Sequence, residues 1–226
     1  NTFAINYFIN SGFIELCFQL LEKKDQSFKY LCDFIAKMEL ELKEEQMISS
    51  LPKDYLSFFE IFITDQSDEI KEPIIKLISQ LTNSNIFTLN ILNLDSLSKK
   101  SFLINQSFRI KKAYLYLFQK IIYYNFQSVH PFLLKLKNFD FLYDFIYNGS
   151  DNEVSCVLKI IYSIITNSFY IIHPPTYFYN LIQSKELYEI IDNIITNENG
   201  IYSFENQYFA SMIYKDINDI KLLDNQ

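Results

Sequence analysis

The sequence has few of the residues that make turns. Its 226 residues include three glycines, five prolines and no tryptophan, although 49% of the residues are apolar and 21% are charged. Chains with so few turn formers favour helices joined by short connections over folds of many strands. The balance of apolar and charged residues excludes a disordered chain. The length allows one extended domain or two small ones.

Positive charge is also scarce. The formal net charge is −7, and Arg109 is the single arginine. Binding to nucleic acid or to an anionic membrane depends on many Lys and Arg side chains that neutralise phosphates, so we expect neither as a general partner. A local basic patch is left open. No apolar run reaches the 18 residues of a membrane-spanning helix, because polar residues interrupt even 160–172.

Cysteines are few and irregularly spaced, at Cys17, Cys32 and Cys156. A disulfide framework would show a denser, even-numbered set, and a zinc site would show paired Cys spacing. The pattern therefore predicts reduced, buried thiols in an intracellular protein, either cytoplasmic or nuclear. The sequence begins without Met or a signal-peptide pattern, and we expect it to be a segment of a longer chain.

Patterns that carry chemistry are missing as well. The glycines at positions 12, 149 and 200 are isolated, so no glycine-rich phosphate loop is present. His130 and His173 each precede proline, which places both in turns, and no further ligands stand at metal-binding spacing. We therefore expect no metal, no cofactor and no enzymatic activity.

One feature that is present is a turn that recurs along the chain. Its copies end at Ser27, Ser67 and Ser107, and successive copies lie 40 residues apart. A serine in such a turn can cap the following helix by accepting a backbone N–H. Farther along, Ser150 and Glu153 form a capping box before another apolar helix. The turns therefore predict a series of long helices that begin at regular intervals.

Apolar residues at helical spacing predict the helices themselves. The expected helices cover 13–21, 28–38, 55–63, 68–81, 107–124, 139–147, 151–167, 177–182, 187–195 and a last one from 204, with shorter apolar segments at 2–9, 86–94, 97–104 and 129–136. The expected buried stripes are Leu31, Phe34, Ile35 and Met38; Ile70, Ile74, Leu77, Ile78 and Leu81; Ile110, Tyr114, Leu117, Phe118 and Ile121; Val154, Leu158, Ile161, Tyr162 and Ile165; and Phe204, Tyr208 and Met212.

The order of these segments resembles a known repeat. Residues 10–16 resemble the glycine-led start of an armadillo second helix, and 151–167 resemble an armadillo third helix. Two short helices, a polar turn and a longer helix, repeated along nearly the whole chain, are similar to armadillo or HEAT-type repeats. The resemblance implies an all-α fold, a right-handed α-solenoid (α-α superhelix) of about five armadillo-like three-helix repeats. The units would be 1–40, 41–83, 84–125, 126–168 and 169–216 of a single domain, 1–226. An ordinary helical bundle remains the alternative.

The best-known members of the armadillo family grip extended peptides with a ladder of Trp and Asn on their third helices. Aligning the helices on Ile70, Ile110, Val154 and Phe204 places the ladder at the pairs Lys76/Gln80, Tyr116/Lys120, Ile160/Ile164 and Ala210/Tyr214. None of these residues is Trp or Asn. The resemblance to nuclear-import adaptors therefore stops at the fold.

The helix predicted at 107–124 combines aromatic and basic residues away from its apolar stripe. Tyr116, Tyr123 and Tyr124 lie there with Arg109, Lys112 and Lys120. Exposed aromatic and arginine side chains commonly anchor protein interfaces. The candidate partner-binding residues are Gln80, Arg109, Lys112, Tyr116, Lys120 and Lys159.

These features predict a non-enzymatic scaffold that binds a partner protein or peptide along the concave face of the solenoid, where stacked repeats usually read their ligands. The alternative is a helical regulatory or structural subunit of a larger assembly, of the phosphatase-regulatory or nuclear-transport type. The sequence leaves the oligomeric state open.

Overall fold

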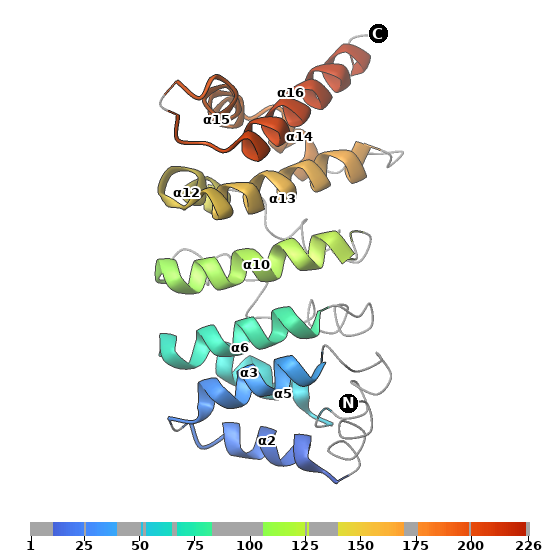
Figure 1. The fold of residues 1–226 in the computed structure, drawn as a ribbon. Coiled ribbons are helices and arrows are strands. Elements are labelled where there is room, and N and C mark those ends of the chain that lie inside the picture. Colours follow the sequence, from blue (N-terminus) through green and yellow to red (C-terminus); the bar gives the residue numbers. More distant parts are fainter. Residues whose placement is uncertain are drawn as a thin grey trace. The chain divides into compact units, whose positions relative to one another are not determined.

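The protein is helical throughout the part of the chain that the structure, a computed structural model, describes. That part comprises residues 11–24, 26–39, 51, 53–64, 67–82, 106–124, 126, 140–169, 176–198 and 200–224, and it contains no strand. Its helices are α2 (Phe13–Leu21), α3 (Phe28–Glu39), α5 (Tyr55–Thr64), α6 (Asp68–Leu81), α10 (Phe108–Tyr124), α12 (Asp140–Asn148), α13 (Asp151–Phe169), α14 (Thr176–Ile182), α15 (Lys185–Thr196) and α16 (Phe204–Asp224) (Figure 1). The all-α prediction is confirmed.

The chain divides into two compact units, Asn1–Lys120 and Ile121–Gln226, and the division falls near the end of α10. In the first unit, α2 packs on α3, and both α3 and α5 pack on α6. Side-chain bonds join α6 to α10, so that α3, α6 and α10 lie side by side (Figure 1). In the second unit, α12, α14 and α16 pack on α13, and α15 packs on α16.

The recurring turn begins helices, as predicted. α3, α6 and α10 each start one residue after Ser27, Ser67 and Ser107, so their starts are 40 residues apart. At the start of α10, Ser107 Oγ accepts the Ile110 N–H at 3.4 Å. These serines give a common origin from which positions along the three helices can be counted.

α13 begins with one of the two bonds of the predicted capping box, the bond from the Ser150 N–H to Glu153. The Ser150 N–H donates to the Glu153 carboxylate at 2.6 Å, and the Ser150 hydroxyl donates to the same carboxylate. Glu153 is only 2% exposed, so it is part of the packed helix start as well as a cap. Just before it, a Cβ on Gly149 would lie 2.3 Å from the Phe145 carbonyl oxygen, and only glycine fits that approach.

The predicted stripes of α6 and α10 are buried throughout, and on α13 only Tyr162 of the stripe is half-buried. Each of these helices also buries a second side. Ile75 on α6, Leu115 on α10 and Val157 on α13 lie outside the predicted stripes, and all three are 0% exposed. A helix that is apolar on two sides needs a neighbour on each. These three helices are therefore enclosed in their units rather than laid on a surface.

The predicted stripe of α3 is partly wrong. Phe34 is 37% exposed and Leu31 is half-buried, whereas Phe28, Cys32 and Ile35 are buried. The buried face of α3 therefore includes the cysteine and is rotated from the expected one. Cys17 and Cys156 are buried too, and none of the three cysteines is in a disulfide, as predicted.

The predicted stripe of α16 is also wrong. Phe204 is 83% exposed and Tyr208 is 54% exposed, while the buried side comprises Asn206, Ala210, Ile213, Ile217 and Ile220. The third residue after the serine that precedes the helix is buried in α6, α10, α13 and α16, where it is Ile70, Ile110, Glu153 and Asn206. The sequence analysis aligned the helices on their first apolar residue, which is Val154 in α13 and Phe204 in α16. Because the equivalent buried residue is polar in both helices, that alignment is wrong by one residue in α13 and by two in α16.

Several predictions lie outside the described residues. They are the short segments 2–9, 86–94, 97–104 and 129–136, and His130 and His173. Among the described helices, none is both long and apolar enough to cross a membrane.

Candidate partner-binding site

A pocket of about 620 Å³ lies within the first unit, where α3, α6 and α10 meet. Its floor is buried and consists of Cys32, Pro73, Leu77, Ser79 and Ala113. Its rim is exposed or half-buried and consists of Asp33, Lys76, Gln80, Tyr116 and Lys120. A mostly apolar floor under a rim of polar and aromatic groups is the usual composition of a ligand site.

The lining residues occupy matching positions on the three helices. Asp33, Pro73 and Ala113 each lie six residues after their serine. Lys76 and Tyr116 lie nine residues after theirs, and Gln80 and Lys120 thirteen. Positions six, nine and thirteen fall on one face of an α-helix. Pro73 and Ala113 are short side chains at the centre of that face, and their size leaves the hollow.

Polar bonds tie α6 to α10 on both sides of the pocket. Toward the helix starts, Ser107 Oγ donates to the Asp68 carboxylate, and Lys71 Nζ donates to Gln106 Oε1 at 2.9 Å. Toward the helix ends, Lys120 Nζ donates to Gln80 Oε1 at 3.2 Å. The two helices are therefore held in register by side chains at the edge of the hollow, and two of those side chains belong to its rim.

Glu72 joins two cations next to the rim. Its carboxylate binds Lys76 Nζ at 2.6 Å and also accepts from Arg109 Nε. Burial by itself would raise the pKa of Glu72, but the hydrogen bonds and charges of Lys76 and Arg109 outweigh it and lower the pKa. Glu72 therefore stays ionised, and the three side chains together carry one net positive charge.

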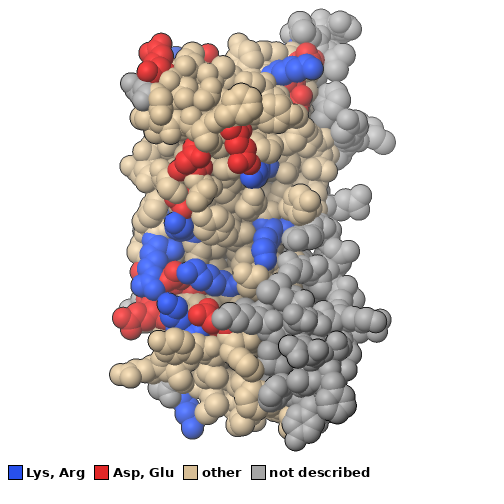
Figure 2. Space-filling view, in the orientation of Figure 1, with Lys and Arg blue, Asp and Glu red and all other residues tan. Residues whose placement is uncertain are grey.

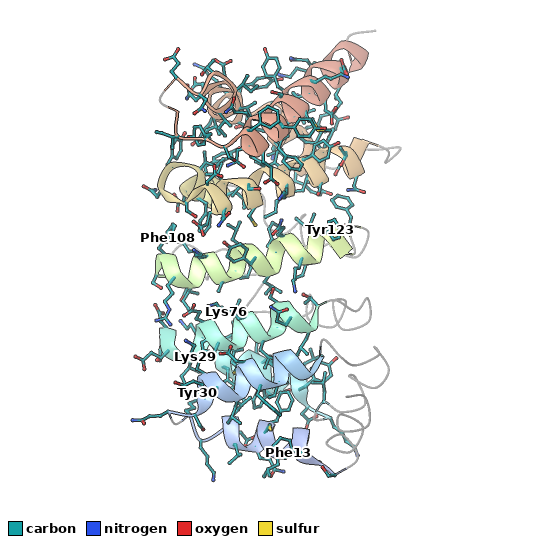
Figure 3. The ribbon with its side chains drawn as sticks, in the orientation of Figure 1. Phe13, Lys29, Tyr30, Lys76, Phe108 and Tyr123 are labelled. Atoms are coloured by element: carbon teal, nitrogen blue, oxygen red, sulfur yellow. The ribbon has the colours of Figure 1, made fainter. Side chains whose placement is uncertain are left out.

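The face around the pocket is basic within an acidic chain. α10 carries Arg109, Lys111, Lys112 and Lys120 and no acidic residue. Figure 2 shows Lys and Arg side chains gathered over α6 and α10, with acidic groups between them. In Figure 3, Lys76 projects from α6 toward α10. The local basic patch that the composition left open is therefore present in the first unit.

The structure brings half of the predicted site residues together. Gln80, Tyr116 and Lys120 line the pocket. Arg109 is bound to Glu72 beside it, and Lys112 is half-buried on the same helix.

Lys159 lies apart from them, on α13 in the second unit. There it binds Glu205 at 2.7 Å and sits over the Phe209 ring at 5.5 Å. Lys159 lies nine residues after Ser150, so its position matches those of Lys76 and Tyr116.

The sequence reasoning missed the rim residues Lys76 and Asp33 and the whole floor. Lys76 had been placed at a ladder position but not among the contacts. Counting from the serines would have found the contributions of α6 and α10, because their lining residues recur at the same offsets. The count does not predict that α3 also lines the pocket, because α3 buries a different face from α6.

Burial raises the pKa of the Cys32 thiol, with a further rise from Asp33, so the thiol on the pocket floor stays protonated and is a poor nucleophile. Among the described residues, no group of three or more His, Cys, Asp or Glu side chains is placed to hold a metal ion.

Comparison with known proteins yields a likeness of fold. No protein-family model matches the sequence, and no curated protein matches it either. The crystal structure of an engineered protein, a target of the Northeast Structural Genomics Consortium, is similar, with a TM-score of 0.67 and 11% sequence identity. The match covers 97% of this chain and 85% of that one. At this identity, the likeness concerns the fold alone.

Proposed function

We propose that this protein is a non-enzymatic interaction scaffold, a right-handed α-solenoid of armadillo-like repeats that binds a partner protein or peptide along the concave face of its long helices. The observation that carries the proposal is the pocket at matching positions of α3, α6 and α10. A face that recurs from helix to helix is the surface on which repeat proteins read extended ligands.

A recurring bond supports the stacked-repeat part of the proposal. In the first unit, Asp68 at the start of α6 accepts from the Ser107 hydroxyl before α10. In the second unit, Asp151 at the start of α13 accepts the Ser203 N–H before α16, at 3.0 Å. Each pair links the first residue of one long helix to the capping serine of the next. The same link in both units is expected when one supersecondary element repeats.

The dimensions of the pocket support the binding part. Its volume of about 620 Å³ lies within the range of about 300–1,000 Å³ that is usual for ligand sites. The rim offers Tyr116, an aromatic group with a polar tip, together with Lys76 and Lys120. Tyrosine is enriched at protein interfaces and is among the residue types that supply most of their binding energy.

The test is affinity capture of partners from the protein's own cells by three forms of the chain. They are the wild type, the rim double variant Lys76→Glu/Lys120→Glu, and the control Lys185→Glu/Lys215→Glu, which makes the same charge change on exposed lysines of the second unit. We expect the rim variant to lose a partner that the wild type and the control retain, while all three melt at similar temperatures. Equal capture by all three forms would contradict the proposal.

A further inference from the structure

Building on the proposed function, we propose that the pocket of the first unit binds an acidic peptide, with one Asp or Glu side chain seated between Lys76 and Lys120 and a neighbouring apolar side chain on the floor. The scaffold function by itself does not specify the charge of the partner. The pocket does, through the arrangement of its rim.

The α10 side of the rim attracts anions. Lys76 shares the Glu72 carboxylate with Arg109, so that group of three keeps one positive charge. Lys120, the second cation of this side of the rim, donates to the amide oxygen of Gln80 at 3.2 Å. With α10 itself carrying four cations and no acid in a chain of net charge −7, the field at this rim is opposite in sign to that of the whole protein. A carboxylate between the two ammonium groups would gain charge-assisted hydrogen bonds from both.

The α3 side of the rim has the opposite preference. Asp33, which is exposed there, repels a carboxylate and can accept from an amide or a cation. Between the two sides, Pro73, Leu77 and Ala113 form an apolar floor. The pocket therefore has a direction: an acidic residue toward α10, an apolar residue over the middle and a hydrogen-bond donor toward α3.

The span of the pocket sets the length of the peptide. Packed helices lie about 8–10 Å apart, so a ligand that crosses from α3 over α6 to α10 covers roughly 20 Å. An extended chain advances about 3.3 Å per residue, and the crossing therefore takes about six residues. A hexapeptide is long enough to reach both sides of the rim at once.

The experiment is affinity selection from a random hexapeptide library by the full chain, with retained peptides identified by mass spectrometry. The key variant is Gln80→Glu, which keeps the shape of the side chain and its bond to Lys120 but cancels that lysine's charge. Lys120→Gln is a second variant that removes the charge directly. The control is Gln183→Glu, the same chemical change on an exposed residue of the second unit.

We expect the wild type and the control to retain peptides enriched in Asp or Glu beside an apolar residue. Both rim variants should bind a selected acidic peptide about three- to tenfold more weakly by fluorescence polarisation, as expected for the loss of one partly screened charge pair. Far-UV circular dichroism should be the same for all four forms.

Other outcomes separate the two proposals. Enrichment of neutral or basic peptides, abolished by Lys76→Glu/Lys120→Glu, would overturn the acidic preference and leave the scaffold function intact. If acidic peptides are enriched but both rim variants retain them as well as the wild type does, the peptides bind elsewhere on the molecule and this inference is wrong. If no class of peptide is retained by the wild type and lost by the rim variants, both the inference and the binding role of this pocket are wrong.

Discussion

The contact between α6 and α10 in the first unit and the contact between α13 and α16 in the second begin alike and then diverge. Both start with an aspartate bound to the serine that precedes the next long helix. In the second unit a fully buried Asn206 then donates to the Asp151 carbonyl oxygen at 3.1 Å and also to its carboxylate. In the first unit the same position after the serine is the apolar Ile110, and the polar bonds lie at the half-exposed edge.

Position nine after the serine shows what this divergence means for function. Lys76 and Tyr116 occupy it on α6 and α10, where both line the pocket. Lys159 occupies it on α13, where Glu205 and Phe209 of α16 hold it. One position on the helix thus borders an open hollow in the first unit and joins two helices in the second. Lys159 therefore belongs with the packing of its own unit rather than with the pocket.

Deleting residues 1–40 should have the largest effect on the difference between the two units, because it removes α2 and α3 from the first unit and uncovers α6. We expect lower solubility and loss of the pocket, with residues 107–214 still helical, because neighbouring repeats hold one another locally. Far-UV circular dichroism and hydrogen exchange would measure this. A closed bundle with a single core predicts cooperative unfolding of the whole chain, and that result would rule out the solenoid.

Truncating the eighth residue after the serine tests whether the two units are packed alike. Ile75→Ala on α6 and Leu158→Ala on α13 each remove a fully buried side chain, and each should cost about 2–5 kcal/mol. Urea denaturation monitored by circular dichroism would measure the cost. Ile61→Ala, at a residue 61% exposed, is the control and should change stability by roughly 0.5 kcal/mol or less. A small cost at Ile75 alone would show that the first unit is loosely packed.

Asn206→Ala sharpens the difference between the two contacts. The change removes the two hydrogen bonds that Asn206 Nδ2 donates to Asp151 from a fully buried site, and we expect a loss of about 1–3 kcal/mol in urea denaturation. The counterpart in the first unit, Lys120→Gln, acts at a half-exposed edge and should cost roughly 0.5 kcal/mol or less. Ser211→Ala, on the exposed side of α16, controls for helix propensity. Equal losses at Asn206 and Lys120 would mean that the two contacts do not differ in kind.

The smallest expected effect is on the pH dependence of stability. Burial alone would raise the pKa of Asp151, but hydrogen bonds from Ser203 and Asn206 outweigh it and lower the pKa below its ordinary 3.8. Glu72 is likewise lowered from 4.5. A carboxyl whose pKa is lower in the folded state stabilises the protein above its ordinary pKa, and the contribution disappears as the pH falls through the folded pKa.

Accordingly, Asp151→Asn and Glu72→Gln should each destabilise the protein more at pH 6 than at pH 3. Urea denaturation across that range would measure the gap between each variant and the wild type. A gap that widens toward pH 3 would contradict the prediction. Because Asp151 is exposed and Glu72 is buried, solvent screening should make the effect smaller at Asp151.

Much of the fold was predictable because local patterns specify it. The serine turns located the starts of α3, α6 and α10, and the apolar spacing of α6 and α10 located their buried stripes. Half of the candidate site followed from the same periodicity: Tyr116 and Lys120 lie off the apolar stripe of α10, Gln80 lies at a ladder position of α6, and all three line the pocket. These features depend on residues within a few helical turns of one another, which the sequence displays directly.

The positions that failed depend on neighbours distant in sequence. Asn206 is polar yet buried, because Asp151, 55 residues away in sequence, accepts its hydrogen bonds. Phe204 is apolar yet exposed, because no described helix covers that side of α16. A hydrophobic pattern predicts burial from the transfer free energy of each side chain by itself. Hydrogen-bond partners from another helix can stabilise a polar side chain in a buried position, and the pattern does not show those partners.

The sequence by itself therefore determined that this protein is helical, where its long helices begin and which side of α6 and α10 faces inward. The tertiary structure alone decided that position nine borders a pocket in one unit and a helix contact in the other, and that α3 contributes Cys32 and Asp33 to the pocket. The physical reason is that helix formation and amphipathicity are local properties, whereas a pocket exists only where side chains from separate helices leave space unfilled.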